Sequence, residues 1–371
     1  MHPRKLARSV LVATLVASAA LFGISPAESA PPVSAPLKAR FAATKKRADG
    51  AKISALFGGT PAKPTLRVKS GKTVPLEPAG SITMPAASAP SEIAKHQAYY
   101  ATVSENPLTD RGVLVATRVD HMARQTPVKD QRSRGTCGAF GVVAGMESYL
   151  RWKSNLEADI SEEHFYKVLK DSVNKDCNSD GTNAQGMQTY LTGKRLCTEA
   201  ELPYAAPSSC VITPACASNA AFVLDRSVVI PGEPAFGGSS YHAGNTKVIE
   251  AFLDMGYDVS IGLDIAGSGW SDDADDGVID VQVDAAGNPA DPRGSHFMLA
   301  VGYDRAGGYF MVKNSWGTGW GRAGYARISY DYMQTYPRGG LVVLEASKKP
   351  VVKAATPTPP VGAARPTAVV R

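Results

Sequence analysis

The sequence lacks an apolar run long enough to cross a bilayer. Its longest such run, Val10–Phe22, has thirteen residues, whereas a transmembrane helix needs about 20. Three basic residues precede this run, and Ser25-Pro-Ala27 after it fits a small-x-small cleavage pattern. These are the parts of a secretory signal peptide. We therefore predict a signal peptide at residues 1–27, secretion to an extracellular or periplasmic location, and no stable membrane insertion once the signal is removed.

Cysteine is also scarce, and its count is odd. The five cysteines among 371 residues are Cys137, Cys177, Cys197, Cys210 and Cys216. Disulfides form and persist in exported proteins, so an odd count predicts at least one unpaired thiol. If Cys137 is unpaired, the other four can form two disulfides in any of three connectivities, between which the sequence does not decide.

Acidic residues are few at both ends of the chain. Residues 1–110 carry 14 Lys or Arg against 6 Asp or Glu, and residues 347–371 carry five Lys or Arg and no acid. Residues 111–346 are therefore acidic, with a net charge of −7, although the whole chain is at +6. A nucleic-acid-binding domain usually has a basic surface, so we expect no nucleic-acid partner. A basic segment before an acidic domain favours docking between the two.

The two basic ends contain few of the residues that build a core. Residues 28–90 are rich in Ala, Pro, Ser and Lys, and residues 347–371 contain five prolines and no aromatic residue. A polar segment between a signal peptide and a folded domain indicates a pro-region at residues 28–110, partly disordered, with a plain disordered spacer as the alternative. The Pro-rich basic tail at 347–371 is expected to be flexible. One folded domain remains, at residues 111–346.

Hydrophobic periodicity in this domain changes from helical to strand-like along the chain. Apolar residues at helical spacing predict a helix from Cys137 to Trp152, and Ser161 is expected to cap a second helix before a third at Asn183–Leu191. Later segments between Gly, Asp and Pro turns predict strands, with one helix at Asn245–Met255. The predicted strands are Val228–Pro231, Val259–Leu263, Phe297–Tyr303, Tyr309–Lys313 and Tyr325–Ser329. Helices first and strands later indicate an α+β domain with two segregated lobes.

Three motifs contain the residue types that nucleophilic catalysis needs. They are Val-Lys-Asp-Gln-x5-Cys137-x-Ala-Phe, Gly-x-His296-x4-Val-Gly-Tyr and Asn314-Ser-Trp-Gly-x2-Trp-Gly. A thiol can attack a carbonyl, an imidazole can hold its proton, and a carboxamide can orient the imidazole. In order and spacing the motifs resemble those of the papain-like cysteine peptidases, and the resemblance covers about two-thirds of the chain.

The resemblance implies a papain-like two-lobed fold, with a helical lobe, an antiparallel β-barrel-like lobe and the active site in the cleft between them. It implies that Cys137, His296 and Asn314 are catalytic, with a resting ion pair between the thiolate and the imidazolium. Gln131 is expected to complete the oxyanion hole with the backbone N–H of Cys137. Trp316 is expected to shield the hydrogen bond between His296 and Asn314 from water.

The substrate-binding residues implied by the resemblance lie on both lobes. Asn183 and Ala184 are expected to offer an extended backbone edge to a peptide. Met187, Gly262 and Phe297 are expected to line an apolar pocket for the second residue before the scissile bond. Ordinary core packing is the alternative for these three residues.

The resemblance also implies the disulfide Cys177–Cys210, which leaves Cys197 and Cys216 as a second pair. The chain departs from the family at three positions. Gly138 stands where the family usually has a tryptophan, and Arg134 and Thr182 replace two cysteines that usually pair with each other. Gly138 is expected to widen the primed side of the cleft or to loosen the start of the helix.

The expected function is that of a secreted cysteine endopeptidase, made as a zymogen, that hydrolyses peptide bonds through a thioester on Cys137. The alternatives are an exopeptidase or transpeptidase on the same scaffold, or a catalytically dead binding module. Expected partners are protein or peptide substrates and the chain's own pro-region as an intramolecular inhibitor, and a monomer is expected. No cofactor is implied. The acidic run at residues 271–277 lacks the residue order of an EF-hand, so a solvated turn is favoured over a calcium site.

Overall fold

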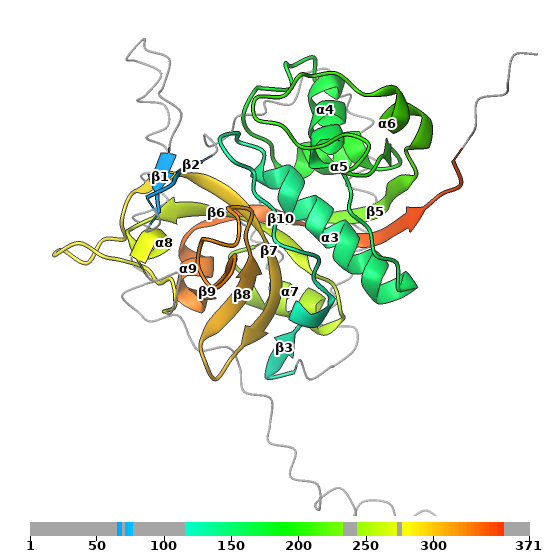
Figure 1. Cartoon of the computed structure of the whole chain (residues 1–371). Helices are drawn as coiled ribbons and strands as arrows, with labels where there is room; N and C mark the ends of the chain where they lie inside the picture. The colour runs from blue at the N-terminus through cyan, green and yellow to red at the C-terminus, as the bar shows by residue number, and fades with distance from the viewer. Residues whose placement is uncertain (1–64, 69–70, 77–115, 233–242, 273–276, 352–371) are drawn as a thin grey trace, which may run out of the picture.

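The computed structural model describes residues 65–68, 71–76, 116–232, 243–272 and 277–351 (Figure 1). The predicted signal peptide, most of the predicted pro-region and all of the predicted tail after Val351 lie outside these ranges. In the part of the chain that is described, no helix has the length and apolar character needed to span a bilayer.

The helices of the first half and the strands of the second half form two lobes, as predicted (Figure 1). The helical lobe is built around a long helix, with shorter helices and a two-residue strand beside it. Its elements are α3 (Cys137–Ser154), α4 (Glu162–Ser172), α5 (Ala184–Leu191), β4 (Arg195–Leu196) and α6 (Pro214–Asn219). The predicted α+β class is confirmed.

The starts of two of these helices follow from capping side chains. Ser161 Oγ accepts a hydrogen bond from the backbone N–H of His164 at the start of α4. Asn183 Oδ1 accepts one from the N–H of Gly186 at the start of α5. Each cap satisfies an N–H that has no partner within the helix, so both helices begin where the sequence predicts.

The second lobe is built on an antiparallel sheet with the strand order β4-β5-β10-β6-β7-β8-β9, to which the helical lobe contributes β4, and β3 pairs with β7. Its strands are β3 (Arg118–Asp120), β5 (Phe222–Ile230), β6 (Val259–Ala266), β7 (Pro292–Asp304), β8 (Tyr309–Lys313), β9 (Tyr325–Ser329) and β10 (Pro337–Lys348). The accompanying helices are η3 (Met122–Arg124), α7 (Thr246–Asp254), α8 (Gly269–Asp272) and α9 (Tyr330–Thr335). Strands β8 and β9 have the predicted bounds.

Strand β10 is the longest strand of the sheet that the sequence did not predict. It lies between β5 and β6, and its last pairs are Ser347 with Val223 and Lys348 with Phe222. The sheet therefore extends two residues into the segment expected to be a flexible tail. Weak period-2 alternation around Gly339 and Gly340 explains why this strand is hard to recognise.

Helix α3 joins the two lobes because it packs on β7, β10 and β6 (Figure 1). It is buried along most of its length. A Cβ at Gly141 would lie 2.7 Å from Ser260 Oγ on β6, which is too close for two atoms that are not bonded. Glycine thus allows the helix to approach the sheet at this point, and this approach places the start of α3 beside β7.

Candidate active site

Cys137 is the first residue of α3 and is fully buried. Its position at a helix N-terminus favours the thiolate, because the helix dipole stabilises negative charge there. Its Sγ accepts a hydrogen bond from the backbone N–H of Phe297 at 3.2 Å. The thiol of the helical lobe therefore lies against strand β7 of the sheet lobe, next to His296. Among the described residues it is the one cysteine outside a disulfide.

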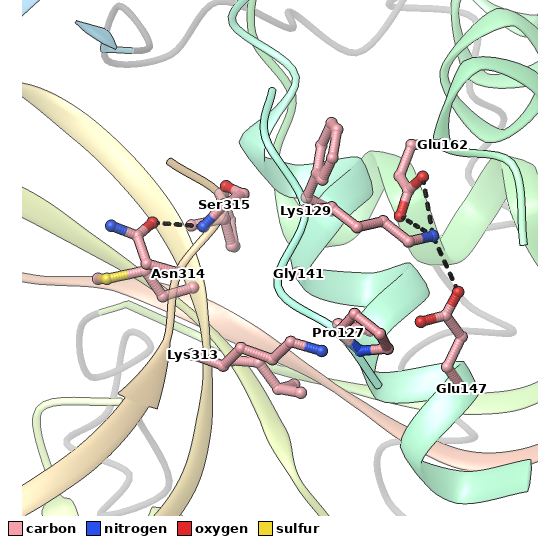
Figure 2. A pocket seen from close by; sticks show the side chains of 13 residues that line it. Pro127, Lys129, Gly141, Glu147, Glu162, Lys313, Asn314 and Ser315 are labelled. Atoms are coloured by element: carbon pink, nitrogen blue, oxygen red, sulfur yellow. Dashed lines mark hydrogen bonds and ion pairs between the residues drawn. The ribbon is translucent and has the colours of Figure 1, made fainter. Parts of the chain in front are cut away.

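His296 is held in place by Asn314 and Trp316. Its Nε2 lies 2.6 Å from Asn314 Oδ1. The same Oδ1 accepts the backbone N–H of Ser315 at 2.7 Å, as Figure 2 shows. An oxygen at this position requires a proton on Nε2, so Nδ1 is the basic nitrogen of the ring. Nδ1 is buried and has no hydrogen-bond partner among the described residues.

The indole of Trp316 covers the imidazole. The two ring centroids lie 4.4 Å apart, with a 34° angle between the planes. Trp316 is itself almost fully buried and contacts the rings of Trp270 and Trp320. A hydrogen bond under such an apolar cover does not compete with water, which strengthens it.

Burial makes the imidazole of His296 a poor base in this structure. It lowers the pKa of His296 to about 4, and the hydrogen bond that Nε2–H donates to Asn314 opposes this effect only in part. The ring is therefore neutral at pH 7, whereas the resting ion pair expected from the sequence needs an imidazolium. Cys137, His296 and Gln131 are each 0% exposed, so the structure represents a closed site in which a substrate could not contact the thiol.

The side chain of Gln131 is held next to the loop that leads into α3. Its Nε2 donates to the backbone carbonyl of Arg134 at 2.9 Å, and its Oε1 accepts from Ser315 Oγ at 2.7 Å. Its backbone N–H donates to Ser315 O at 2.8 Å. The carboxamide is thus oriented from both lobes, with one N–H of the amide engaged by the Arg134 carbonyl.

The five residues expected to bind substrate are not all arranged as expected. Phe297 lies beside Cys137, and Gly262 on β6 pairs with Phe297 on β7. Met187 of α5 packs against the start of α3, where its Sδ would be 3.1 Å from a Cβ at Gly138. Asn183 is extended, but Ala184 is already the first residue of α5. The expected extended edge is therefore one residue long at this point.

Gly138 does not open the cleft. A Cβ at this position would lie 2.2 Å from Thr182 Cγ2, so the space beside the helix start is filled by Thr182 and by Met187. The expectation of a wider primed side is therefore wrong for Gly138.

The structure pairs Cys177 with Cys210 and Cys197 with Cys216, the pairs that the resemblance implied.

A buried charge cluster lies behind the helix start. Figure 2 shows Lys129 between Glu162 and Glu147. Its Nζ lies 3.0 Å and 3.1 Å from their carboxylate oxygens and 2.8 Å from Asp159 Oδ1. Burial lowers the pKa of Lys129, but the three carboxylates outweigh this effect and raise it. The neighbouring cavity, of about 20 Å³, is too small for a substrate side chain. Lys129 and Glu162 also line a larger cavity, of about 480 Å³, so the cluster both anchors the segment before Gln131 and borders a space wide enough for a side chain.

Two groups of potential metal ligands lie close together in the described residues. They are His164, Cys197 and Cys216, and Asp176, Cys177 and Cys210. In both groups the cysteines are disulfide partners. Their sulfur atoms are therefore not available as thiolate ligands.

A hairpin from the predicted pro-region lies against this site. This hairpin was not predicted from the sequence. Its strands are β1 (Thr65–Arg67) and β2 (Thr73–Pro75), paired antiparallel. Its buried side chains are Leu66, Val68, Val74 and Leu76, which join the core of the sheet lobe together with Trp316. The signal that could have revealed it is the alternation Leu-x-Val and Val-x-Leu on either side of a Ser-Gly turn.

The hairpin also makes a charged contact with the residue just before Gln131. Lys72 Nζ lies 2.7 and 2.6 Å from the two carboxylate oxygens of Asp130, the residue before Gln131. It also donates to the backbone carbonyl of Trp316 at 3.3 Å. A single lysine of the predicted pro-region therefore contacts Trp316 itself and the residue before Gln131.

Comparison with known proteins gives one family. Residues 115–338 match the family described as papain family cysteine protease. Cysteine proteinase B of Leishmania mexicana is 31% identical over 207 residues, which cover 55% of this chain and 42% of that protein. Human cathepsin L2 is 28% identical over 213 residues, 56% of this chain and 58% of that protein. The chain thus spans about half the length of the curated relatives it matches.

A solved structure with a similar fold is xylellain, a cysteine protease from Xylella fastidiosa. It is 20% identical, has a TM-score of 0.45, and covers 62% of this chain and 86% of its own. A likeness of this size adds nothing to the assignment, which depends on the sequence match over residues 115–338.

Proposed function

Because the chain belongs to the papain family of cysteine proteases, we propose that it is an exported endopeptidase that uses Cys137, His296 and Asn314. The observation that carries this proposal is the imidazole of His296. Its Nε2 is bound by Asn314, and its Nδ1 is left without a partner among the described residues, on the strand whose next N–H reaches Cys137 Sγ. A base oriented in this way is ready to exchange a proton with a thiol.

The proposed reaction has two steps. In the first, the Cys137 thiolate bonds to the carbonyl carbon of the scissile peptide, and the carbonyl oxygen becomes an oxyanion. Gln131 Nε2 and the backbone N–H of Cys137 donate hydrogen bonds to this oxyanion. The C–N bond then breaks, and the leaving amine takes the proton from Nδ1 of His296, which leaves a thioester.

In the second step water attacks the thioester. His296 Nδ1 accepts a proton from the water, the C–S bond breaks, and the acid product leaves with the new oxygen. The Cys137 thiolate and the protonated imidazole are restored, so protons and electrons balance over the cycle. Trp316 keeps water from the bond between His296 and Asn314, and this bond holds the ring in one tautomer throughout.

The described form would be the closed precursor, and the hairpin at residues 65–76 its docking element. Four apolar side chains of the hairpin are buried against the sheet lobe, and Lys72 pairs with Asp130 beside Gln131. Substrate would need these contacts to loosen, because Cys137 is fully covered. Exposure of the site to water would also raise the basicity of His296, so the ion pair would belong to the opened enzyme.

The decisive experiment compares the full-length protein with its Cys137→Ala variant. After incubation under reducing conditions, each is given a mixed peptide library, and the products are identified by mass spectrometry. Internal cuts that depend on Cys137 are expected. Removal of one or two terminal residues only would indicate an exopeptidase, and the absence of Cys137-dependent products would refute the proposal.

A second experiment tests the docking role. Lys72→Met removes the ion pair with Asp130, while Arg67→Met removes an exposed charge from the same hairpin. Self-processing of the first variant should be faster than that of the wild type, whereas the second should process at the wild-type rate. Equal rates for all three would exclude a contribution of Lys72 to closure. Amino-terminal sequencing of the protein recovered from culture medium would test export.

A further inference from the structure

Arg134 occupies a position where the papain family usually has a cysteine, and its side chain is nearly fully buried. A buried guanidinium needs several acceptors, because an unpaired charge in the interior is strongly unfavourable. Arg134 finds three of them. Its terminal nitrogens donate to Glu163 Oε2 at 2.5 Å, to Ala205 O at 2.7 Å and to Cys177 O at 2.8 Å.

These three acceptors belong to three separate segments. Glu163 is in α4, Cys177 follows α4 and forms the disulfide with Cys210, and Ala205 lies in the later loop. The guanidinium thus connects the segment before the nucleophile to the rest of the helical lobe. A disulfide would make one such connection, whereas Arg134 makes three.

Two tyrosines complete the attachment of the loop. The guanidinium carbon lies 5.1 Å from the ring centroid of Tyr204 and 5.4 Å from that of Tyr166. Tyr204 Oη donates to Gln131 O at 2.8 Å and lies 2.7 Å from Thr136 Oγ1. Tyr166 Oη donates to Ser179 O at 2.6 Å and has Gly135 O as a second, longer acceptor at 3.1 Å. The rings that enclose the guanidinium therefore hold both ends of the loop from residue 131 to residue 136.

The backbone of Arg134 contacts the oxyanion glutamine directly. Its carbonyl accepts Gln131 Nε2 at 2.9 Å, and its N–H donates to Gln131 O at 3.4 Å. The direction of the Gln131 amide therefore depends on where the Arg134 carbonyl lies. That carbonyl is positioned by a side chain with three anchors and two aromatic neighbours.

We propose that Arg134 is a positioning residue for the oxyanion hole, which holds the Gln131 amide in its productive direction through the loop that both residues share. The inference rests on the proposed function, since it concerns the transition state of the same reaction. An oxyanion donor acts mainly on the transition state, so misdirecting it should lower kcat and leave KM nearly unchanged. Substitution of a residue that only stabilises the fold would lower the urea midpoint of unfolding and leave kcat and KM unchanged.

The test is a double-mutant cycle on the activated enzyme. The first change is R134M combined with E163Q, because methionine alone would leave the Glu163 carboxylate buried and unpaired. The second change is Q131A, which should lower kcat by roughly 100- to 1,000-fold, as expected for the loss of one oxyanion donor. We expect R134M/E163Q to lower kcat by up to about 100-fold when Gln131 is present, and by less than about threefold when it is absent.

Two further variants keep the result interpretable. R134K retains the charge but cannot form the forked contacts, so it should also lower kcat. It takes the place of R134M/E163Q in the cycle if that variant does not fold. R305M together with E250Q removes an ion pair of similar burial at the far side of the sheet lobe. This control should lower the urea midpoint but keep the wild-type kcat per titratable thiol.

The outcomes separate the two proposals. If the wild type shows no Cys137-dependent cleavage, the proposed function fails and the cycle has no signal. If the wild type cleaves but the Arg134 variants lose the same factor with and without Gln131, then Arg134 does not act through the glutamine and the inference is wrong. A loss confined to the background that contains Gln131, with an unchanged KM, supports it.

Discussion

Acid should weaken the closed form of the protein through His296. Burial lowers the pKa of this imidazole from 6.5 to about 4. Because the folded value lies below the unfolded one, the unfolded chain binds more protons between about pH 6.5 and pH 4. The free energy of unfolding therefore falls as the pH falls through this window. With about 1.4 kcal/mol for each pKa unit, His296 alone should lower it by about 3 kcal/mol.

The measurement uses the full-length Cys137→Ala variant, which cannot process itself. Urea unfolding curves between pH 4 and pH 7 give the free energy of unfolding at each pH. The same curves are recorded for a second variant that also carries His296→Asn, whose side chain does not titrate. The second variant should lose most of the decrease between pH 6.5 and 4, whatever its absolute stability.

Two further arms make this test specific. The hydrogen bond that His296 donates to Asn314 raises the pKa of His296, so Asn314→Ala should extend the decrease below pH 4. Burial also lowers the pKa of His164, so His164→Asn should remove a smaller decrease of its own and leave that of His296 in place. Parallel curves with and without His296 would refute the reasoning, because they would mean that the imidazole titrates alike in the folded and unfolded states.

Three other changes have expected outcomes. Asp258→Asn should lower the free energy of unfolding by about 3 kcal/mol in urea titrations, because the carboxylate accepts hydrogen bonds from Arg124 in η3 and Ser148 in α3; an unchanged urea midpoint would contradict this. Trp316→Ala should expose the hydrogen bond between His296 and Asn314 to water and lower kcat roughly tenfold. Steady-state kinetics measures this change, and Trp320→Phe should keep the wild-type kcat. Leu66→Ala should destabilise the docked hairpin by about 2 kcal/mol or more and speed self-processing on gels; slower processing would count against a docking role.

The sequence predicts much of the framework because its local signals agree with the final packing. Ser161 and Asn183 are good N-caps, and they cap the helices in the structure. The alternation and turn residues around Tyr309–Lys313 and Tyr325–Ser329 gave strands with the same bounds. In each case, the residues that decide the local structure are next to one another in the chain, so no tertiary information is needed.

What the sequence could not predict depends on contacts between distant segments. The hairpin at residues 65–76 has the alternation of a strand pair, but two strands alone are barely stable in water. Its order depends on a partner surface far away in the sequence, which includes Trp316. The low basicity of His296 is likewise a consequence of burial from both lobes, which a motif cannot indicate. The motif indicates His296 as a candidate base, whereas the lowering of its pKa follows from burial that only the fold creates.

The departures from the family at positions 134, 138 and 182 are best understood as one packed arrangement. A Cβ on Gly138 would collide with Thr182, 2.2 Å away, so glycine follows from the side chain that replaced the second cysteine. The first cysteine is replaced by Arg134, whose guanidinium binds the carbonyl of Cys177 in the segment that leads to Thr182. Restoring a tryptophan at position 138 alone would therefore displace Thr182 and strain the helix start that carries Cys137. Arg134, Gly138 and Thr182 thus pack together around the helix start that carries Cys137.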